Sequence, residues 1–316
     1  MSILSLFVLI PVLMLGGLFL SRNISQVRTV ATIGSALQLI LAIVLSVLFC
    51  MERNAGNTAE MLFMADHLWF APLNIHYAVG VDGVSVLMIL LSAIIVFAGV
   101  FASWKMDPLP KEFFIWLILL STGVFGFFIS IDLFTMFLFY EVALIPMYLL
   151  IGIWGSGHKF YSAMKLTLML MGGSALLMLG ILGIYFNSSA DGELTMNILK
   201  IAENNAIPIE MQYLLFPLTF VGFGVLGAMF PFHTWSPDGH ASAPTAVSML
   251  HAGVLMKLGG YGCFRVAMYL MPQATVELSW IFLILTGISV VYGAFSACVQ
   301  TDLKYINAYS SVSHCG

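Results

Sequence analysis

The sequence has 316 residues, of which 61% are hydrophobic and only 8% are Asp, Glu, Lys or Arg. Its mean hydropathy is +1.03. A water-soluble chain of this length could not bury so much apolar surface, so the composition excludes a soluble globular protein. The formal net charge is −4. No basic patch accompanies it, which argues against nucleic acid as a partner.

Apolar segments recur along the whole chain and predict an all-α, polytopic membrane protein with about ten transmembrane helices. A barrel is disfavoured because its strands would alternate apolar with polar residues, whereas a stretch such as 113–131 is apolar on every face. The first segment lacks the flanks of a signal peptide, so we interpret it as an uncleaved span. The predicted spans are 3–20, 30–50, 84–104, 112–130, 133–153, 161–187, 213–232, 245–269 and 279–299, with a tenth beginning near Ile306.

Lysine and arginine favour one set of connections between the spans. The odd-numbered connections carry Arg22, Arg28, Lys105, Lys111, Lys159 and Lys304, and the even-numbered ones carry Arg53, Lys200 and Arg265. By the positive-inside rule, the odd connections are cytoplasmic and the N-terminus is extracytoplasmic. The sequence stops about ten residues into an apolar segment, where a span would need about 20, so we expect a C-terminally truncated chain.

Two ionisable residues lie near the middle of predicted spans. Glu141 is about 12 Å from the start of its span, and Lys257 is similarly central in 245–269. A charge at the centre of a membrane helix costs about 2.5–3.5 kcal/mol on insertion scales, so such residues are functional candidates by default. Both groups can exchange protons when burial favours their neutral forms. A static ion pair or a hydrogen-bonded structural group is the alternative for each.

Several histidines are further candidates. His251 lies about 9 Å from Lys257 along the same span, which suits either a proton relay or a structural hydrogen bond. His314, in the last segment, could likewise serve either as a proton relay or as a structural hydrogen-bonding residue. His233 and His240 flank a turn, where a capping or water-contacting role competes with relay.

Other polar residues have simpler interpretations. Lys165 lies near the start of its span and can extend to the membrane interface. Asp132 precedes the span of Glu141 and is interpreted as its N-cap. The four cysteines show no pairing or metal-ligand spacing, which favours packing roles: Cys50, Cys263, Cys298 and Cys315.

Three ordered groups of motifs carry a resemblance to a known family. They are FYEVALIPMY at 139–148; FPFHTWSPDGH at 230–240 with APTA at 243–246 and AGVLMKLGGY at 252–261; and QTDLKY at 300–305 with YSSVSH at 309–314. These segments resemble the fifth helix, the seventh and eighth helices, and the ninth-to-tenth boundary of subunit M of NADH-quinone oxidoreductase, an antiporter-like subunit of respiratory complex I. The resemblance covers essentially the whole chain.

The resemblance implies a fold of fourteen helices with two inverted five-helix repeats, each holding a broken helix. Residues 1–111 would then be the first three helices with an extracytoplasmic loop, 112–269 the first repeat, and 270–316 the start of the second. It also implies a non-redox subunit that translocates protons through mid-membrane charges, driven by quinone reduction in another subunit. Glu141, Lys257 and His314 match the family's carboxylate, its lysine on helix eight and a histidine on helix ten.

The resemblance further implies that this chain binds no cofactor, because NADH, flavin, iron–sulfur clusters and quinone belong to partner subunits. The expected partners are the other membrane subunits of complex I, including neighbours of the L and N types, and the lipid bilayer. The expected location is the inner (cytoplasmic) membrane.

One departure from the family bears on mechanism. Leu226 stands where the family has a lysine on helix seven, and Ala228 stands where many members have proline. His251 matches a histidine of the L and N types and could substitute for that lysine. We hypothesise a proton path through Glu141, His251 and Lys257, or else a copy that pumps poorly.

Two other classes of protein compete with this assignment. The same module would serve a multi-subunit sodium/proton antiporter or a membrane-bound hydrogenase. A redox-active quinone or haem subunit has little support, because the sequence shows no cysteine cluster, no histidine pair at haem spacing and no nucleotide loop.

Overall fold

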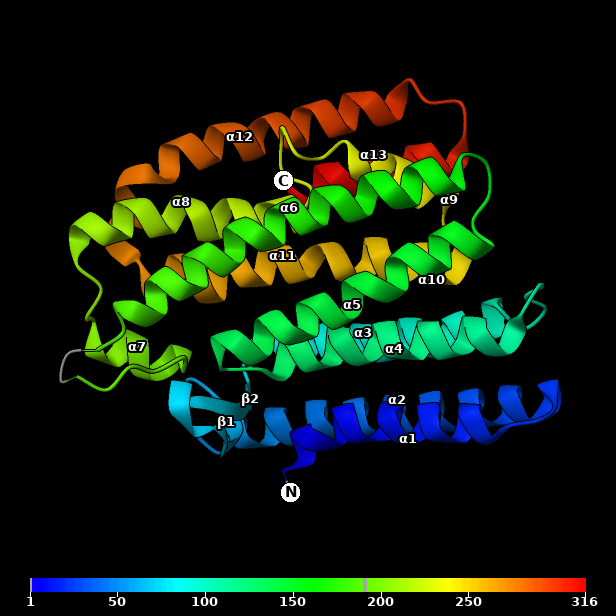
Figure 1. The fold of residues 1–316 in the computed structure, drawn as a ribbon, viewed down its shortest axis with the longest axis horizontal. Coiled ribbons are helices and arrows are strands. Elements are labelled where there is room, and N and C mark those ends of the chain that lie inside the picture. Colours follow the sequence, from blue (N-terminus) through cyan, green and yellow to red (C-terminus); the bar gives the residue numbers. More distant parts are fainter. Residues whose placement is uncertain (1, 190–191) are drawn as a thin grey trace.

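The computed structural model describes residues 2–189 and 192–316. Its long helices run side by side in one layered bundle, with α1 and α2 at one edge and α12 at the other (Figure 1). Within the described residues, eight helices are long and apolar enough to cross a membrane. The predicted polytopic helical class is therefore confirmed. The long helices are α1 (Leu6–Leu20), α2 (Ile24–Asn54), α3 (Gly83–Ala102), α4 (Pro110–Ile129), α5 (Leu133–Trp154), α6 (Lys159–Phe186), α8 (Ile209–Leu226) and α12 (Pro272–Cys298).

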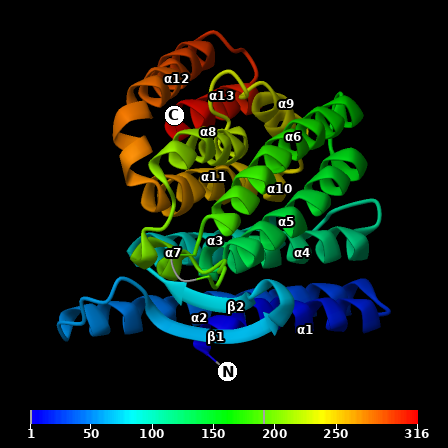
Figure 2. The ribbon, with the colours of Figure 1, turned by 60° about the vertical axis from the view of Figure 1, so that its left-hand side comes forward.

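A β-hairpin occupies the connection between α2 and α3, which the sequence predicted only as a long loop. Strand β1 (Leu62–Phe70) pairs antiparallel with β2 (Ile75–Val81), and a short 3₁₀ turn, Ala71–Leu73, joins them. Figure 2 shows the hairpin crossing the end of the bundle between α2 and α3. Most of β1 is exposed, so the strand lacks the apolar alternation by which half-buried strands are recognised.

The hairpin fixes the start of α5. The backbone N–H of Ile131 donates to the carbonyl of Ala78 in β2 (2.9 Å), and the Thr135 hydroxyl donates to the carbonyl of His76 (3.1 Å). Asp132 accepts from the backbone N–H groups of Phe134 and Thr135 at 3.1 Å each. The predicted N-cap role of Asp132 is confirmed, and one end of the helix carrying Glu141 is thereby anchored.

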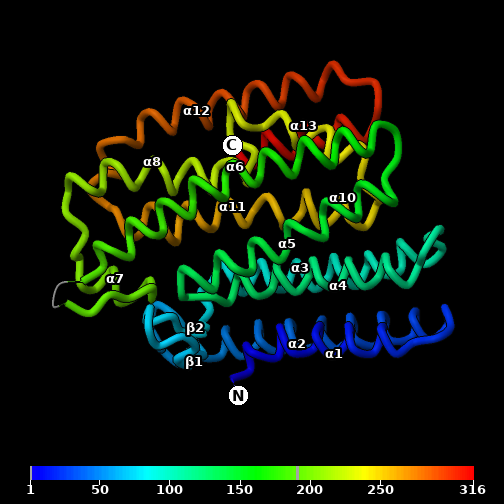
Figure 3. Tube along the Cα trace, viewed as in Figure 1, coloured from blue at the N-terminus to red at the C-terminus, as the bar shows by residue number. Residues whose placement is uncertain are grey.

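The chain after α8 is broken into short pieces. The predicted span 213–232 ends as helix at Leu226, and an irregular stretch leads to the short helix α9 (Figure 3). Pro231 lies in that stretch and cannot donate a helical hydrogen bond. The predicted span 245–269 is present but contains two π-helical turns. Its pieces are α10 (Thr245–Leu250), a π-helix (His251–Leu255), α11 (Met256–Gly262) and a second π-helix (Cys263–Met268).

The remaining elements are short: α7 (Ile198–Asn204), α9 (Trp235–Ser242) and α13 (Leu303–Cys315). Helix α7 lies beside the hairpin, whereas α9 and the start of α13 lie at the opposite end of the bundle (Figure 1). The tenth predicted span corresponds to α13, which begins at Leu303 with Asp302 as its N-cap.

Helix α11 packs backbone to backbone on α8 through Gly259. A Cβ placed at Gly259 would lie 2.5 Å from both the backbone nitrogen of Gly227 and the carbonyl oxygen of Phe223. The neighbouring Gly260 has nothing within 4 Å of the same position. The contact that places Lys257 against the end of α8 therefore requires glycine at 259 but not at 260.

Gly259→Ala is expected to destabilise the protein, because the backbone of α8 must move to admit the methyl group. Overpacking of this kind costs about 1–3 kcal/mol. Thermal denaturation in detergent measures the effect, and Gly260→Ala is the matched control, which should behave as the original protein. Equal stability of the two variants would contradict the close approach of α11 and α8.

Candidate functional site

A fully buried histidine lies between two other rings at the break in the bundle. The ring of His251 stacks on Trp235 at 5.2 Å with an interplanar angle of 11°, and on His240 at 4.1 Å with an angle of 24°. Neither ring nitrogen of His251 has a hydrogen-bond partner among residues 2–189 and 192–316. His240 is partnered, with Nδ1 3.3 Å from the Ser248 hydroxyl and Nε2 3.5 Å from the Met256 sulfur. Within the described residues, both nitrogens of the His251 ring are therefore free of hydrogen bonds, whereas those of His240 are not.

Lys257 lies next to this pair, between the two π-helical turns. Its ammonium donates to the carbonyl of Ala252, five residues earlier and inside the first π-turn. A π-turn closes over one more residue than an α-turn and so displaces carbonyls from the regular ladder. The ammonium is within electrostatic range of both imidazole rings. The structure thus brings the predicted residues His251 and Lys257 together.

Glu141 lies on α5 and faces α6. The Ser174 side chain of α6 is close enough to interact with its carboxylate, and the adjacent Tyr140 donates from its hydroxyl to the carbonyl of Leu170 (3.1 Å). One carboxylate oxygen of Glu141 is buried without a hydrogen-bond partner in the described part of the chain. The ion pairs found among these residues do not include Glu141. Within the described residues, its carboxylate therefore has no basic partner.

The position of the family lysine lies between Glu141 and the ring stack. Leu226 is 1% exposed and ends α8. The preceding residue, Val225, packs against Gly173 of α6, beside Ser174. The carbonyl of Val225 accepts a hydrogen bond from the Trp235 indole (3.1 Å). Leu226 therefore puts a buried apolar side chain next to the residue that contacts both α6 and Trp235.

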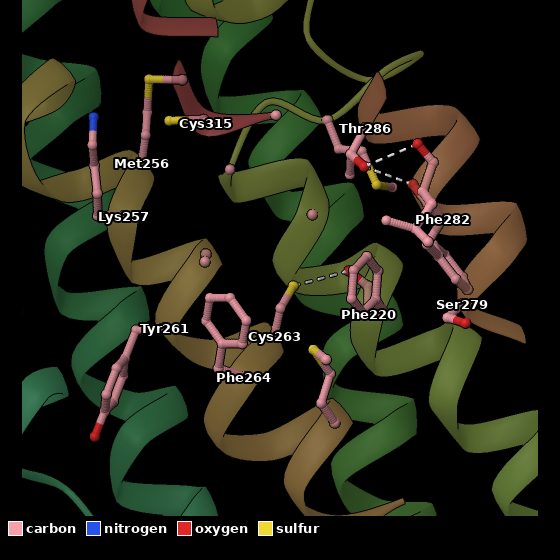
Figure 4. A pocket seen from close by; sticks show the side chains of 18 of the residues that line it. Phe220, Met256, Lys257, Tyr261, Cys263, Phe264, Ser279, Phe282, Thr286 and Cys315 are labelled. Carbon is pink, nitrogen blue, oxygen red and sulfur yellow. Dashed lines mark hydrogen bonds between the residues drawn. The ribbon is translucent and has the colours of Figure 1, made fainter. Parts of the chain in front are cut away.

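A cavity of 610 Å³ adjoins Lys257 and is also lined by His314. Lys257 and Cys315 lie on one side of it, and Phe282 and Thr286 of α12 lie on the other (Figure 4). Most of its wall is apolar, formed by α8, α11 and α12. The structure places the predicted residue His314 within reach of this same space.

Lys165 has a partner that the sequence did not predict. Its ammonium forms an ion pair with Asp238 of α9 at 2.7 Å. The hydroxyl of Tyr305, in α13, donates to the other oxygen of Asp238 at 3.3 Å. Both charged side chains are about one-quarter exposed. The pair ties α6, α9 and α13 together at the end of the bundle opposite the hairpin.

Sequence reasoning did not predict the ring stack. The sequence pattern does not point to Trp235, and for His240 it is compatible with relay as well as with a capping or water-contacting role. The structure buries both rings, leaving His240 1% exposed. One available signal was Gly239, where a Cβ would lie 2.9 Å from the Leu166 side chain. A glycine inside so short a helix indicates close packing, and hence burial of its neighbours.

Comparisons with known proteins agree with this architecture. Residues 130–316 match the family described as NADH:quinone oxidoreductase/Mrp antiporter, TM. NAD(P)H-quinone oxidoreductase chain 4 3 of Picosynechococcus sp. is 38% identical over 82% of this chain and 47% of its own length. NADH-quinone oxidoreductase subunit M of Rickettsia bellii is 33% identical over 95% of this chain and 60% of its own length.

The fold is also that of a solved structure. A chain of respiratory complex I from Thermus thermophilus superposes with a TM-score of 0.86 at 24% identity, over 99% of this chain and 62% of that one. The chain thus spans about half to three-fifths of the length of these proteins. Because the family match extends over more than half of its residues, the chain belongs to the NADH:quinone oxidoreductase/Mrp antiporter transmembrane family.

Proposed function

We propose that this chain is a proton-translocating, non-redox membrane subunit of an NADH:quinone oxidoreductase. The names of its relatives support this assignment. The observation that carries it is His251, a fully buried imidazole with two unpaired nitrogens beside Lys257 on an interrupted helix. A structural histidine would have at least one partner, because an unpaired buried polar atom costs about 1–3 kcal/mol.

In the proposed mechanism, protons move between groups that hold them in turn. Glu141 takes a proton at the α5–α6 contact, the His251–His240 pair passes it on, and Lys257 holds it next to the cavity that His314 lines. Neutral imidazole accepts at one nitrogen and donates at the other, which suits the middle position. The energy comes from quinone reduction, which belongs to other subunits.

The assembly and orientation form part of the proposal. The partners are other membrane subunits of the complex, with L-type and N-type neighbours, and NADH, flavin, iron–sulfur clusters and quinone are bound there. The N-terminus and the hairpin are extracytoplasmic, and the membrane is the inner (cytoplasmic) one. Residues 112–269 form the first five-helix repeat and 270–316 begin the second; the break after α8 lies inside the first repeat, where the proposed division expects a broken helix.

Glu141→Gln in the assembled complex is expected to lower proton translocation per NADH oxidised. Glutamine keeps the size of the side chain but cannot carry a proton. A positioned proton carrier contributes a factor of about 10² or more, so a fall of at least about tenfold is expected. Quenching of a pH-sensitive dye in inverted vesicles measures translocation, with NADH oxidation recorded in parallel. Glu210→Gln, at an exposed site in the first turn of α8, is the control; equal translocation in both variants would refute the role of Glu141.

A further inference from the structure

A buried arginine joins the helix of Lys257 to both ends of the hairpin. Arg265, in the second π-turn, is 9% exposed. Its guanidinium donates to Glu60 at 2.6 Å and to Asp82 at 2.5 Å. Glu60 precedes β1 and Asp82 follows β2, so the two carboxylates bracket the hairpin. The hairpin end of the bundle and the broken helix are therefore linked through one side chain.

Each carboxylate is itself held in place by a second contact. The other oxygen of Asp82 accepts from the backbone N–H of Ser85 (2.7 Å), because Asp82 is also the N-cap of α3. The other oxygen of Glu60 accepts from the Tyr269 hydroxyl (2.7 Å), and the Tyr269 ring lies 5.2 Å from the guanidinium. Arg265 is thus attached to groups with little freedom to move. Removing it would leave the carboxylate of Asp82, which is only 17% exposed, without its charged partner.

The geometry of the helix gives this attachment a consequence for Lys257. Lys257 lies eight residues before Arg265, and the turn Cys263–Met268 that holds Arg265 is π-helical. A π-turn contains one residue more than an α-turn, and one residue corresponds to about 100° of rotation about the helix axis. With Arg265 fixed, relaxation of this turn to α-helix would rotate Lys257 away from its present direction.

We propose that Arg265 is a positioning residue for ion translocation. By holding the second π-turn against Glu60 and Asp82, it aims Lys257 at the carbonyl of Ala252 and at the His240–His251 pair. The hairpin is accordingly part of the machinery that orients the central lysine. This inference rests on the proposed function, because it assigns Arg265 a role in the same path.

Arg265→Gln in the assembled complex tests the proposal with two independent measurements. Amide hydrogen exchange of peptides covering 256–268 should be at least about fivefold faster, because a π-turn without its anchor opens more readily. Translocation per NADH should fall, and its pH profile should shift as Lys257 leaves its neighbours. Arg265→Lys, which can still pair with one carboxylate, should recover part of both properties.

Two further variants make the result interpretable. Arg22→Gln is the matched control, because Arg22 is exposed in the connection before α2 and the ion pairs found among the described residues do not include it. It should leave exchange at 256–268 and translocation unchanged. If Arg265→Gln fails to assemble, Glu60→Gln removes only one of the two partners and should show the same effects in weaker form.

The possible outcomes separate the two proposals. Lost translocation with unchanged exchange and an unchanged pH profile would mean that Arg265 serves assembly alone, and it would overturn the positioning role. Faster exchange with full translocation would overturn it as well. If Lys257→Met left translocation intact, the proposed function would fail, while the exchange comparison would still decide whether Arg265 holds the π-turn.

Discussion

Replacing Lys257 with methionine is expected to abolish proton translocation in the assembled complex. Methionine preserves the length and flexibility of the side chain but has no group that binds a proton. Lys257 lies between the buried histidine pair and the cavity lined by His314, so its loss would interrupt the proposed path at its centre. We expect translocation per NADH to fall by a factor of about 10².

The measurement is dye quenching in inverted vesicles, normalised to the amount of assembled complex. Lys200→Met, at an exposed site on α7, is the matched control and should translocate normally. Retention of more than half of the original translocation by Lys257→Met would show that protons do not pass through this lysine.

The sequence could predict Glu141 and Lys257 because a charge within an apolar span is rare and costly. It could also predict Asp132 as a cap, since that role depends only on neighbouring residues. These predictions share a local cause. They need the hydropathy of one segment and no knowledge of what packs against it.

The features that were missed depend on contacts between distant segments. Nothing in the local sequence of Arg265 indicates that Glu60 and Asp82 will meet it, about 200 residues apart in one case. The π-turns on both sides of Lys257 could not be predicted from the sequence either, because the apolar pattern of 245–269 suits an unbroken helix. The hairpin was not predicted because most of β1 is exposed, so its sequence lacks the apolar–polar alternation of a half-buried strand.

Lys165 illustrates the same limit for charges. Its position near the start of a span suggested a side chain that reaches the interface. The break after α8, however, brings Asp238 of α9 within 2.7 Å of its ammonium. The break therefore gives Lys165 of α6 an ionic partner on α9, and Asp238 in turn contacts Tyr305 of α13. The sequence of α6 alone does not indicate this pair.

His251→Phe is expected to separate function from stability. Phenylalanine can keep the stack between Trp235 and His240 while removing two buried nitrogens that have no partner. Translocation should fall by about tenfold or more because the relay loses a proton carrier. Thermal stability in detergent should be equal or higher, because the two unpaired buried nitrogens of this ring are removed. His158→Phe makes the same substitution at an exposed site before α6. As the control, it should leave translocation unchanged.

Leu226→Lys then tests whether His251 stands in for the missing lysine. Leu226 lies next to Val225, whose carbonyl holds the indole that stacks on His251, so a lysine introduced there enters the same part of the path. In the His251→Phe background it should restore translocation, and alone it should raise the proton yield per electron. A buried lysine needs a partner to be tolerated, and the unpaired carboxylate oxygen of Glu141 is available as one. If translocation stays low in the double variant although the complex assembles, His251 does more than replace a lost positive charge, and the path requires the imidazole itself.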